Sequence, residues 1–423
     1  MANTTSDILV FEPDPRGHAQ EWLEHLIDWT EAHPGAPRLT LVVAQGLSGD
    51  LRHRASEVVR IITLSPRECR LCNHRSLAVS AMSRWWAMRR HLAGTGATHG
   101  FFLALDHLAL PLALSLPTGG KPVSGILFRP TSHYHEFGSG PGTWRERVRD
   151  LHKQLLTRLM LRNPRVWAVY SIDPFFPDYA ARHYAKGDKV VELGDPAFPP
   201  PEPDEQERAL VADLPSDRTT FVLFGEITWR KGPLPLLAAL ARMPEEQAAR
   251  CSVVLAGRID PPIRDAVLDA VRESQEARPG LRLKVVDRRL AAGEITALIQ
   301  RSDAVLVPYQ RFVGSSGVLL WAAQLRRPVI CQAYGLVGEL TRRYRLGAAV
   351  DSSDPDALSR AIAGAVRNGA GELCDPEMMA RFVADRTPEA FSGTLLSGLA
   401  EPVVEGAESP ADGDYDWSQR FPV

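Results

Sequence analysis

The chain has 423 residues, of which 44% are hydrophobic and 24% charged, and its formal net charge is −2. This is the composition of an ordinary globular protein, and roughly 150 residues per domain suggests two or three domains. So small a net charge gives no overall positive field to hold nucleic acid, and the chain has no recognised nucleic-acid-binding motif. We therefore expect no nucleic-acid partner.

Cysteine usage and apolar runs indicate a cytoplasmic protein. The chain has five cysteines, too few for a disulfide framework at this length. The first residues, MANTTSDILVFEPD, lack the basic and apolar regions of a secretory signal. The chain has no run of about 18 apolar residues, so we expect no transmembrane helix.

Short apolar runs alternate with helix-like stretches in the first half of the chain. The expected strands are 7–11, 38–43, 58–64, 100–105, 123–128, 166–172 and 189–193. The expected helices are 19–32, 76–92, a segment that opens at Asp106-His107, and 145–161. Strands that alternate with helices predict βαβ units and a mainly parallel sheet.

A proline-rich stretch then interrupts this alternation. The segment 195–204, DPAFPPPEPD, has five prolines, which resist both helix and central strand. We therefore predict a first domain over 1–194, a linker over 195–218 and a second domain over 219–402. Residues 403–423 have the composition of a disordered tail.

The second half repeats the alternation. Its expected strands are 220–224, 252–256, 283–286, 304–307, 328–330 and 348–350. Its expected helices are a segment that ends near Arg242, 292–300, 318–325 and 356–366. Ligands of such sheets bind beyond the carboxyl ends of the strands, so the loops that follow strands are the candidate sites.

Three of these loops carry groups suited to phosphates or sugars. The loop 225–232 starts at Gly225 and carries Arg230 and Lys231, two cations able to reach a diphosphate. The alternative is that the loop is only a basic turn exposed to solvent. The second loop precedes a helix whose free N–H groups favour an anion, although a tight turn with a serine cap is the alternative. Its candidate residues are Arg311, Gly314, Ser315, Ser316 and Gly317. The third loop offers Gly338 and Glu339, and its glycines are equally typical of a helix entry.

The first half offers candidates for an acceptor site. Gly17 and His18 follow the first strand, whereas Asp106, His107 and Arg129 follow later ones. His133 lies in the same late loop, RPTSHYH, and we add it to Lys231 and Arg230 as a catalytic candidate. A lone histidine is more often structural or merely exposed, and that alternative stays open for each of them.

Two further patterns concern a possible metal site and possible contact with a membrane. Cys69, Cys72 and His74 invite a zinc hypothesis, but structural zinc needs four ligands and no second pair is visible, so we predict no metal. The segments 84–90 and 144–162 are basic and amphipathic, which suits peripheral contact with the inner membrane face. The alternative is that they are helices that cover the sheet.

The second half resembles the donor domain of the retaining family-four glycosyltransferases, the glycosyl transferases of group 1, over roughly residues 221–366. The resemblance rests on six features that occur in this order: Gly225 with Lys231-Gly232, SVVLAG ending at Gly257, DAVLVP (303–308), GSSG (314–317), RPVI (327–330) and 335–339. It implies the GT-B fold, in which two Rossmann-like doubly wound domains face each other across a cleft. In the first half, only the architecture and the Gly17-His18 turn match.

The resemblance also implies roles for single residues. Lys231 matches the lysine that neutralises the leaving diphosphate, while Glu226 stands where the family has an arginine, a loss for which Arg230 is a candidate substitute. Val313 and Trp321 stand where the family carries its paired glutamates. The chain is thus a divergent member that lacks both of these acids.

The implied function is transfer of a sugar from a nucleotide diphosphate sugar, such as a UDP-sugar, to a hydroxyl acceptor with retention, as in a hexosyltransferase. No cofactor or metal is implied, because Lys231, Arg230 and loop amides supply the positive field. The acceptor, a polysaccharide, lipid carrier or natural product, stays open. Two alternatives are a catalytically impaired homologue that binds a partner and, less favoured, a nucleotide-sugar epimerase of the same architecture.

Overall fold

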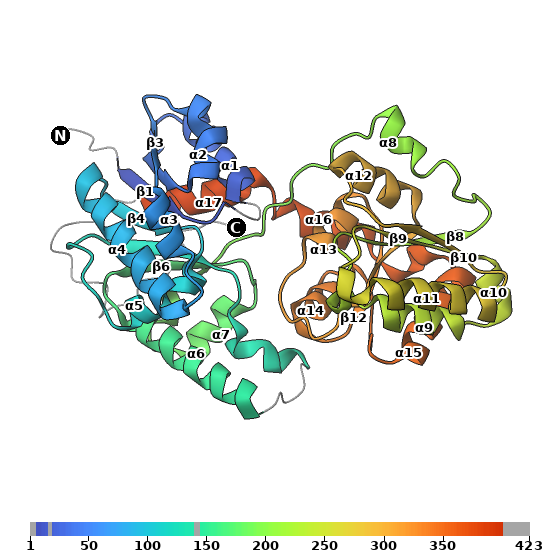
Figure 1. Cartoon of the computed structure of the whole chain (residues 1–423). Coiled ribbons are helices and arrows are strands. Elements are labelled where there is room, and N and C mark those ends of the chain that lie inside the picture. The colour runs from blue at the N-terminus through green and yellow to red at the C-terminus, as the bar shows by residue number, and fades with distance from the viewer. Residues whose placement is uncertain (1–5, 16–18, 139–143, 401–423) are drawn as a thin grey trace. The chain divides into compact units, whose positions relative to one another are not determined.

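The computed structural model describes residues 6–15, 19–138 and 144–400, and the chain divides into two compact domains (Figure 1). The first comprises Met1–His133, Gly142–Pro196 and Arg386–Val423, and the second comprises Tyr134–Pro141 and Ala197–Asp385. None of the helices in these described ranges is both long and apolar enough to cross a bilayer.

The first domain is built on a seven-stranded sheet in the order β3-β2-β1-β4-β5-β6-β7, in which every neighbouring pair is parallel. The strands are β1 (Asp7–Glu12), β2 (Arg38–Val43), β3 (Val59–Thr63), β4 (His99–Phe102), β5 (Val123–Leu127), β6 (Val166–Ser171) and β7 (Val190–Glu192). The order reverses between β1 and β4, which makes the carboxyl ends of these two strands the topological switch point.

Helices cover both faces of this sheet. They are α1 (Ala19–Ala32), α2 (Gln45–Leu51), α3 (Pro66–Cys72), α4 (Leu77–Thr95), α5 (Ala109–Ala113), α6 (Trp144–Arg162), α7 (Phe176–His183) and α17 (Pro388–Ala400). The right-handed crossovers from β3 through to β6 place α4, α5 and α6 on one face, where α4 contacts α5 and α5 contacts α6. One buried cluster accordingly holds Met88 of α4, Leu112 of α5 and Met160 of α6.

The second domain is built on a six-stranded parallel sheet in the order β10-β9-β8-β11-β12-β13. The strands are β8 (Thr219–Phe224), β9 (Cys251–Ala256), β10 (Arg282–Val286), β11 (Ala304–Val307), β12 (Val329–Gln332) and β13 (Gly347–Val350). The helices are α8 (Glu205–Ala209), α9 (Pro233–Ala241), α10 (Glu245–Ala249), α11 (Pro261–Ala277), α12 (Ala292–Arg301), α13 (Gly317–Gln324), α14 (Gly335–Arg343), α15 (Pro355–Asn368) and α16 (Pro376–Ala384). Its switch point lies between β8 and β11.

The prediction of two doubly wound parallel domains is confirmed, but two boundaries are corrected. Most of the predicted linker belongs to the second domain, which begins at Ala197 and includes α8. Helix α17, predicted to end the second domain, packs on α1 of the first domain, where the Phe391 and Trp22 ring centroids lie 4.9 Å apart. The buried side chains Phe391, Leu395 and Leu399 need an apolar surface, and α1 supplies it. The predicted tail 403–423 lies outside the described residues.

Candidate functional site

The loops that follow β8 and β11 meet at the switch point of the second domain. The Gln310 N–H donates to the Arg230 carbonyl over 2.7 Å. A Cβ on Gly232 would lie 2.0 Å from the Pro308 carbonyl oxygen, and the φ of this glycine is +71°. The two loops therefore approach each other at a distance that only glycine allows at position 232.

This close approach predicts a large cost for adding one methyl group. We expect Gly232→Ala to lower the free energy of unfolding by about 2 kcal/mol, because alanine both clashes with the Pro308 carbonyl and disfavours a positive φ. Gly364→Ala on α15 is the matched control, since nothing lies within 4 Å of the added Cβ there. Urea unfolding of both variants checks this, and equal stabilities would contradict it.

Lys231 projects its ammonium group between the two loops. Its Nζ donates to the Phe224 carbonyl and to the Tyr309 hydroxyl, each over 3.0 Å, and lies 4.9 Å from the centre of the Tyr309 ring. A Cβ at Gly225 would lie 3.2 Å from the same Nζ. The ends of β8 and β11 thus hold one cation in a fixed position, half-buried, at the switch point.

The Tyr309 hydroxyl extends this arrangement to the start of α13. It lies 3.1 Å from Ser316 Oγ, which in turn accepts from the Val318 N–H at the helix N-cap over 3.3 Å. The geometry is therefore compatible with both interpretations of this loop, a turn with a serine cap and an anion site, because Ser316 caps the helix beside the Lys231 cation. The positive end of the α13 dipole and the Lys231 ammonium together make this a favourable place for an anion.

The other predicted residues of these loops surround the same place. Arg230 is exposed and its guanidinium carbon lies 5.0 Å from the centre of the Phe312 ring. Arg311 is also exposed, with a left-handed φ of +51°, and its N–H donates to the Tyr334 hydroxyl over 2.6 Å. Gly314 is buried next to Phe312, whereas Ser315 is half-buried and Gly317, the first residue of α13, is exposed.

Gly338 and Glu339 lie within α14, which the sequence did not predict as a helix. A Cβ on Gly338 would lie 2.5 Å from the Ala333 carbonyl oxygen, so this glycine allows close packing of helix against strand end, as the helix-entry alternative expects. Glu339 accepts from Arg342 over 2.8 Å, and Arg342 also donates to the Ala333 carbonyl.

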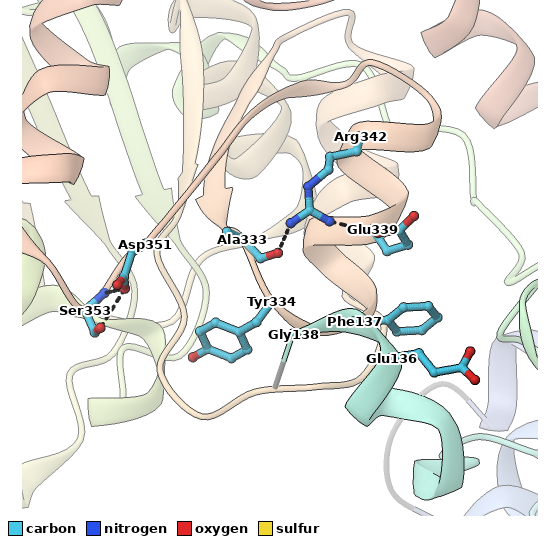
Figure 2. Close-up of a pocket in the computed structure, with 9 residues that line it drawn as sticks. All are labelled: Glu136, Phe137, Gly138, Ala333, Tyr334, Glu339, Arg342, Asp351 and Ser353. Atoms are coloured by element: carbon cyan, nitrogen blue, oxygen red, sulfur yellow. Dashed lines mark hydrogen bonds and ion pairs between the residues drawn. The ribbon is translucent and has the colours of Figure 1, made fainter. Parts of the chain in front are cut away.

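Glu339 borders a pocket of about 550 Å³ in the second domain, shown in Figure 2. Tyr334 and Asp351, which follow β12 and β13, line it together with Glu136 and Phe137. Hydrogen bonds from the hydroxyl and the N–H of Ser353 lower the pKa of Asp351. Lys231 does not line the pocket, but the lining residue Tyr334 donates its hydroxyl to the Tyr309 carbonyl, so the pocket adjoins the loop that holds the Lys231 ammonium.

The switch point of the first domain holds a buried carboxyl group that the sequence analysis missed. Glu12 ends β1, is 4% exposed and accepts the Asp14 N–H over 2.8 Å. Burial raises its pKa from 4.5 to about 7, against the opposing effects of that N–H and of Arg84. Its position as the last residue of a strand could have identified it as a candidate from the sequence.

Arg84, the first residue of the basic segment 84–90, is also buried, as the alternative of a helix that covers the sheet expects. It donates to the Cys72 carbonyl and to Asn73 Oδ1, each over 2.9 Å. Cys72 is buried in the core, and the described residues contain no cluster of His, Cys, Asp or Glu that is arranged to hold a metal ion.

His133, predicted as a catalytic residue, lies in the interior of the first domain. Its side chain is 0% exposed, with Nε2 3.0 Å from Asp173 Oδ2 and Nδ1 2.8 Å from the Pro130 carbonyl oxygen. The Phe176 and Tyr179 rings flank it at centroid distances of 5.4 and 5.3 Å. Enclosed in this way, His133 has the surroundings expected of a structural histidine, the alternative that the sequence leaves open.

The remaining first-domain candidates have mixed outcomes. Both carboxylate oxygens of Asp106 accept backbone N–H groups, from Phe128 over 2.8 Å and from Arg129 over 3.1 Å, so Asp106 fixes the loop after β5. The His107 side chain is exposed on one side, but neighbouring atoms remove part of its hydration; this desolvation is the main effect that lowers its pKa, and the positive charge of Arg84 lowers it further. Gly17 and His18 lie outside the described residues.

Comparisons with known proteins agree with this architecture. The model matches the HepE protein of Anabaena in complex with UDP (14% identity, TM-score 0.65, covering 94% of this chain and 100% of that one). It also matches the sucrose-phosphate synthase of Thermosynechococcus elongatus (16%, 0.64, 92% and 97%) and a glycosyltransferase of Rickettsia africae (14%, 0.64, 94% and 100%).

At the level of sequence, no curated protein matches the chain significantly. A family model does match one segment, residues 218–368, and its description is "Glycosyl transferases group 1". This segment contains the loops that hold Lys231 and Ser316. The chain therefore has the fold of the GT-B glycosyltransferases, and its residues 218–368 match the family model of the glycosyl transferases of group 1.

Proposed function

We propose that this protein transfers a sugar from a nucleotide diphosphate sugar to a hydroxyl acceptor. The observation that carries the proposal is the position of Lys231, whose ammonium group is held by Phe224 and Tyr309 beside the N-terminus of α13. When the bond between sugar and diphosphate breaks, negative charge builds on the diphosphate. A cation and helix N–H groups that are already in place stabilise that charge without reorganisation.

The proposed roles follow from this geometry. Lys231 binds the diphosphate, and the loop 314–317 offers it backbone N–H groups. Arg230 and Arg311 are exposed where their two loops meet, at the hydrogen bond from the Gln310 N–H to the Arg230 carbonyl, so their side chains can add positive charge there. Glu339 remains a proposed donor contact. Retention and the absence of a metal requirement are parts of the proposal that rest on the resemblance alone.

UDP is the first nucleotide to test, because related folds have been crystallised with UDP and with UDP-glucose. The test is a thermal-shift titration of the full chain with UDP, GDP, ADP and dTDP. A nucleotide at about 100 times its dissociation constant stabilises the native state by about 2.7 kcal/mol and so raises Tm. We expect one nucleotide to raise Tm in the wild type and not in Lys231→Ala.

Lys284→Ala is the matched control, because Lys284 is a lysine of the same domain that bonds to the Leu210 carbonyl and to Asp213. It should retain the nucleotide response. If none of the four nucleotides shifts Tm, the donor-site proposal is wrong. The alternative, an impaired homologue that binds a partner, is favoured by Val313 and Trp321, which are not acids, and would then be the function to pursue.

A further inference from the structure

Helices α4 and α6 of the first domain both expose apolar side chains on the side that faces away from their sheet. On α4, Val79 and Trp86 are seven residues apart and therefore share one side, opposite the buried Ala81 and Met88. Val79 is 40% exposed and Trp86 is 50% exposed. Neither side chain is needed for the core that the same helix builds.

Helix α6 carries a longer stripe of the same kind. Its members follow the helical repeat and extend over about 16 Å of the helix. They are Val148, Leu151, Leu155 and Leu159, which are 56%, 64%, 53% and 36% exposed. Met160 and Leu161, on the other side of the helix, are buried in the core.

The two helices belong to one layer of the domain. Both contact α5 and, by the right-handed crossovers, lie on the same face of the sheet; the three helices can be followed in Figure 1. Leu114, directly after α5, is 59% exposed. We call the exposed side chains of these three helices the α4–α6 face.

Basic side chains border the apolar ones on this face. Arg158 and Arg162 are exposed and adjoin the leucine stripe in the helical repeat, whereas Asp150 lies on the other side of α6. The segment Trp144–Arg162 has six Arg or Lys residues and two acids, in a chain whose net charge is −2. On α4, the Arg89 guanidinium lies 5.0 Å from the centre of the Trp86 ring, and Arg90 pairs with Glu68.

We propose that the α4–α6 face docks the protein on an anionic lipid surface. Leucine and tryptophan side chains enter the boundary between headgroups and acyl chains, while arginines beside them bind the anionic headgroups. A second copy of this chain is a poorer occupant, because self-association through this face would bring the basic residues of both copies into one contact, where like charges repel. The charge pattern therefore selects lipid over self-association.

Sedimentation of the full chain with lipid vesicles tests this proposal. We expect binding to vesicles that contain phosphatidylglycerol, weak binding to pure phosphatidylcholine, and loss of binding as salt rises. The double variants Leu151→Glu/Leu155→Glu and Arg158→Glu/Arg162→Glu should each weaken binding about tenfold or more. Since these side chains are exposed, both variants should retain the wild-type Tm.

The matched controls come from the second domain. Leu234→Glu on α9 replaces a leucine that is 36% exposed, and Arg360→Glu on α15 reverses an exposed charge. Neither should change lipid binding. If the wild type does not sediment with anionic vesicles, or if the α6 variants bind as well as the controls, the proposal is overturned. A change of oligomeric state in the leucine variant, with no change in lipid binding, would assign the face to self-association instead.

Lipid docking is independent of the proposed transferase activity. Lys231→Ala should bind vesicles as well as the wild type does, whereas the α6 variants should keep their response to nucleotide. Failure of one proposal therefore leaves the other measurable.

Discussion

Replacing Lys231 by alanine should lower turnover by about 100- to 1000-fold, the loss expected when one fixed charge-stabilising donor is removed from a reacting oxygen. The Lys231 ammonium is anchored by the Phe224 carbonyl and the Tyr309 hydroxyl, so the wild-type cation needs no rearrangement as charge develops. Alanine leaves the space empty and the diphosphate without its nearest cation. The measurement is release of nucleoside diphosphate from UDP-glucose, GDP-mannose, ADP-glucose or dTDP-glucose, with water as the hydroxyl acceptor.

The variant Tyr309→Phe separates the effect of the Lys231 charge from the effect of its fixed position. It keeps the aromatic ring beneath the ammonium but removes the hydroxyl that links Lys231 to Ser316. We expect a loss of about tenfold, smaller than that of Lys231→Ala, because the cation remains but is less well fixed. Lys284→Ala should keep wild-type turnover. Equal turnover in Lys231→Ala and Lys284→Ala would contradict the proposed role.

The sequence predicts the strands of both sheets well, and physics explains this success. Strands of a parallel sheet are covered on both faces, so they appear as short continuous apolar runs. The predicted 38–43 and 304–307 coincide with β2 and β11. Because loops after such strands gather at one edge, the sequence places the Lys231 and Ser316 loops at the same edge, whereas their contact depends on the pairing of β8 with β11, which the sequence did not predict.

Helices with few buried apolar residues are harder to predict from the sequence. Helix α11 spans Pro261–Ala277, yet its buried residues are Val267, Val271 and Ser274. These three residues are spaced i, i+4 and i+7, so the helical repeat is present, but only two of its members are strongly apolar. Helix α14 was missed because Gly335 and Gly338, which suggest a loop, serve close packing within a helix.

Contacts between distant parts of the chain are the second limit. Helix α17 is apolar enough to be predicted as helix, but its partner α1 lies at the other end of the chain. Likewise, nothing local marks Arg84 as buried or His133 as the partner of Asp173. Burial of a polar side chain depends on which long-range partners satisfy it, and a single sequence does not specify them.

Glu12 should make the stability of the first domain depend on pH near neutrality. Its carboxyl group has a folded-state pKa of about 7 and an ordinary value of 4.5. The folded state therefore holds a proton that the unfolded chain has lost between these values. The contribution of this group to the free energy of unfolding is therefore full below about pH 4.5. It is lost as the pH rises through 7, and the free energy of unfolding falls by about 3 kcal/mol.

Glu12→Gln should remove this dependence. Glutamine keeps an oxygen to accept the Asp14 N–H but carries no charge to bury. We expect the variant to match the wild type near pH 5 and to be more stable by up to about 3 kcal/mol at pH 8.5. Glu57→Gln, an exposed glutamate of the same domain, is the control. Thermal melts across this range measure the difference from wild type, which cancels other titrating groups such as the buried His99. A difference that stays constant with pH would refute the assignment of the titration to Glu12.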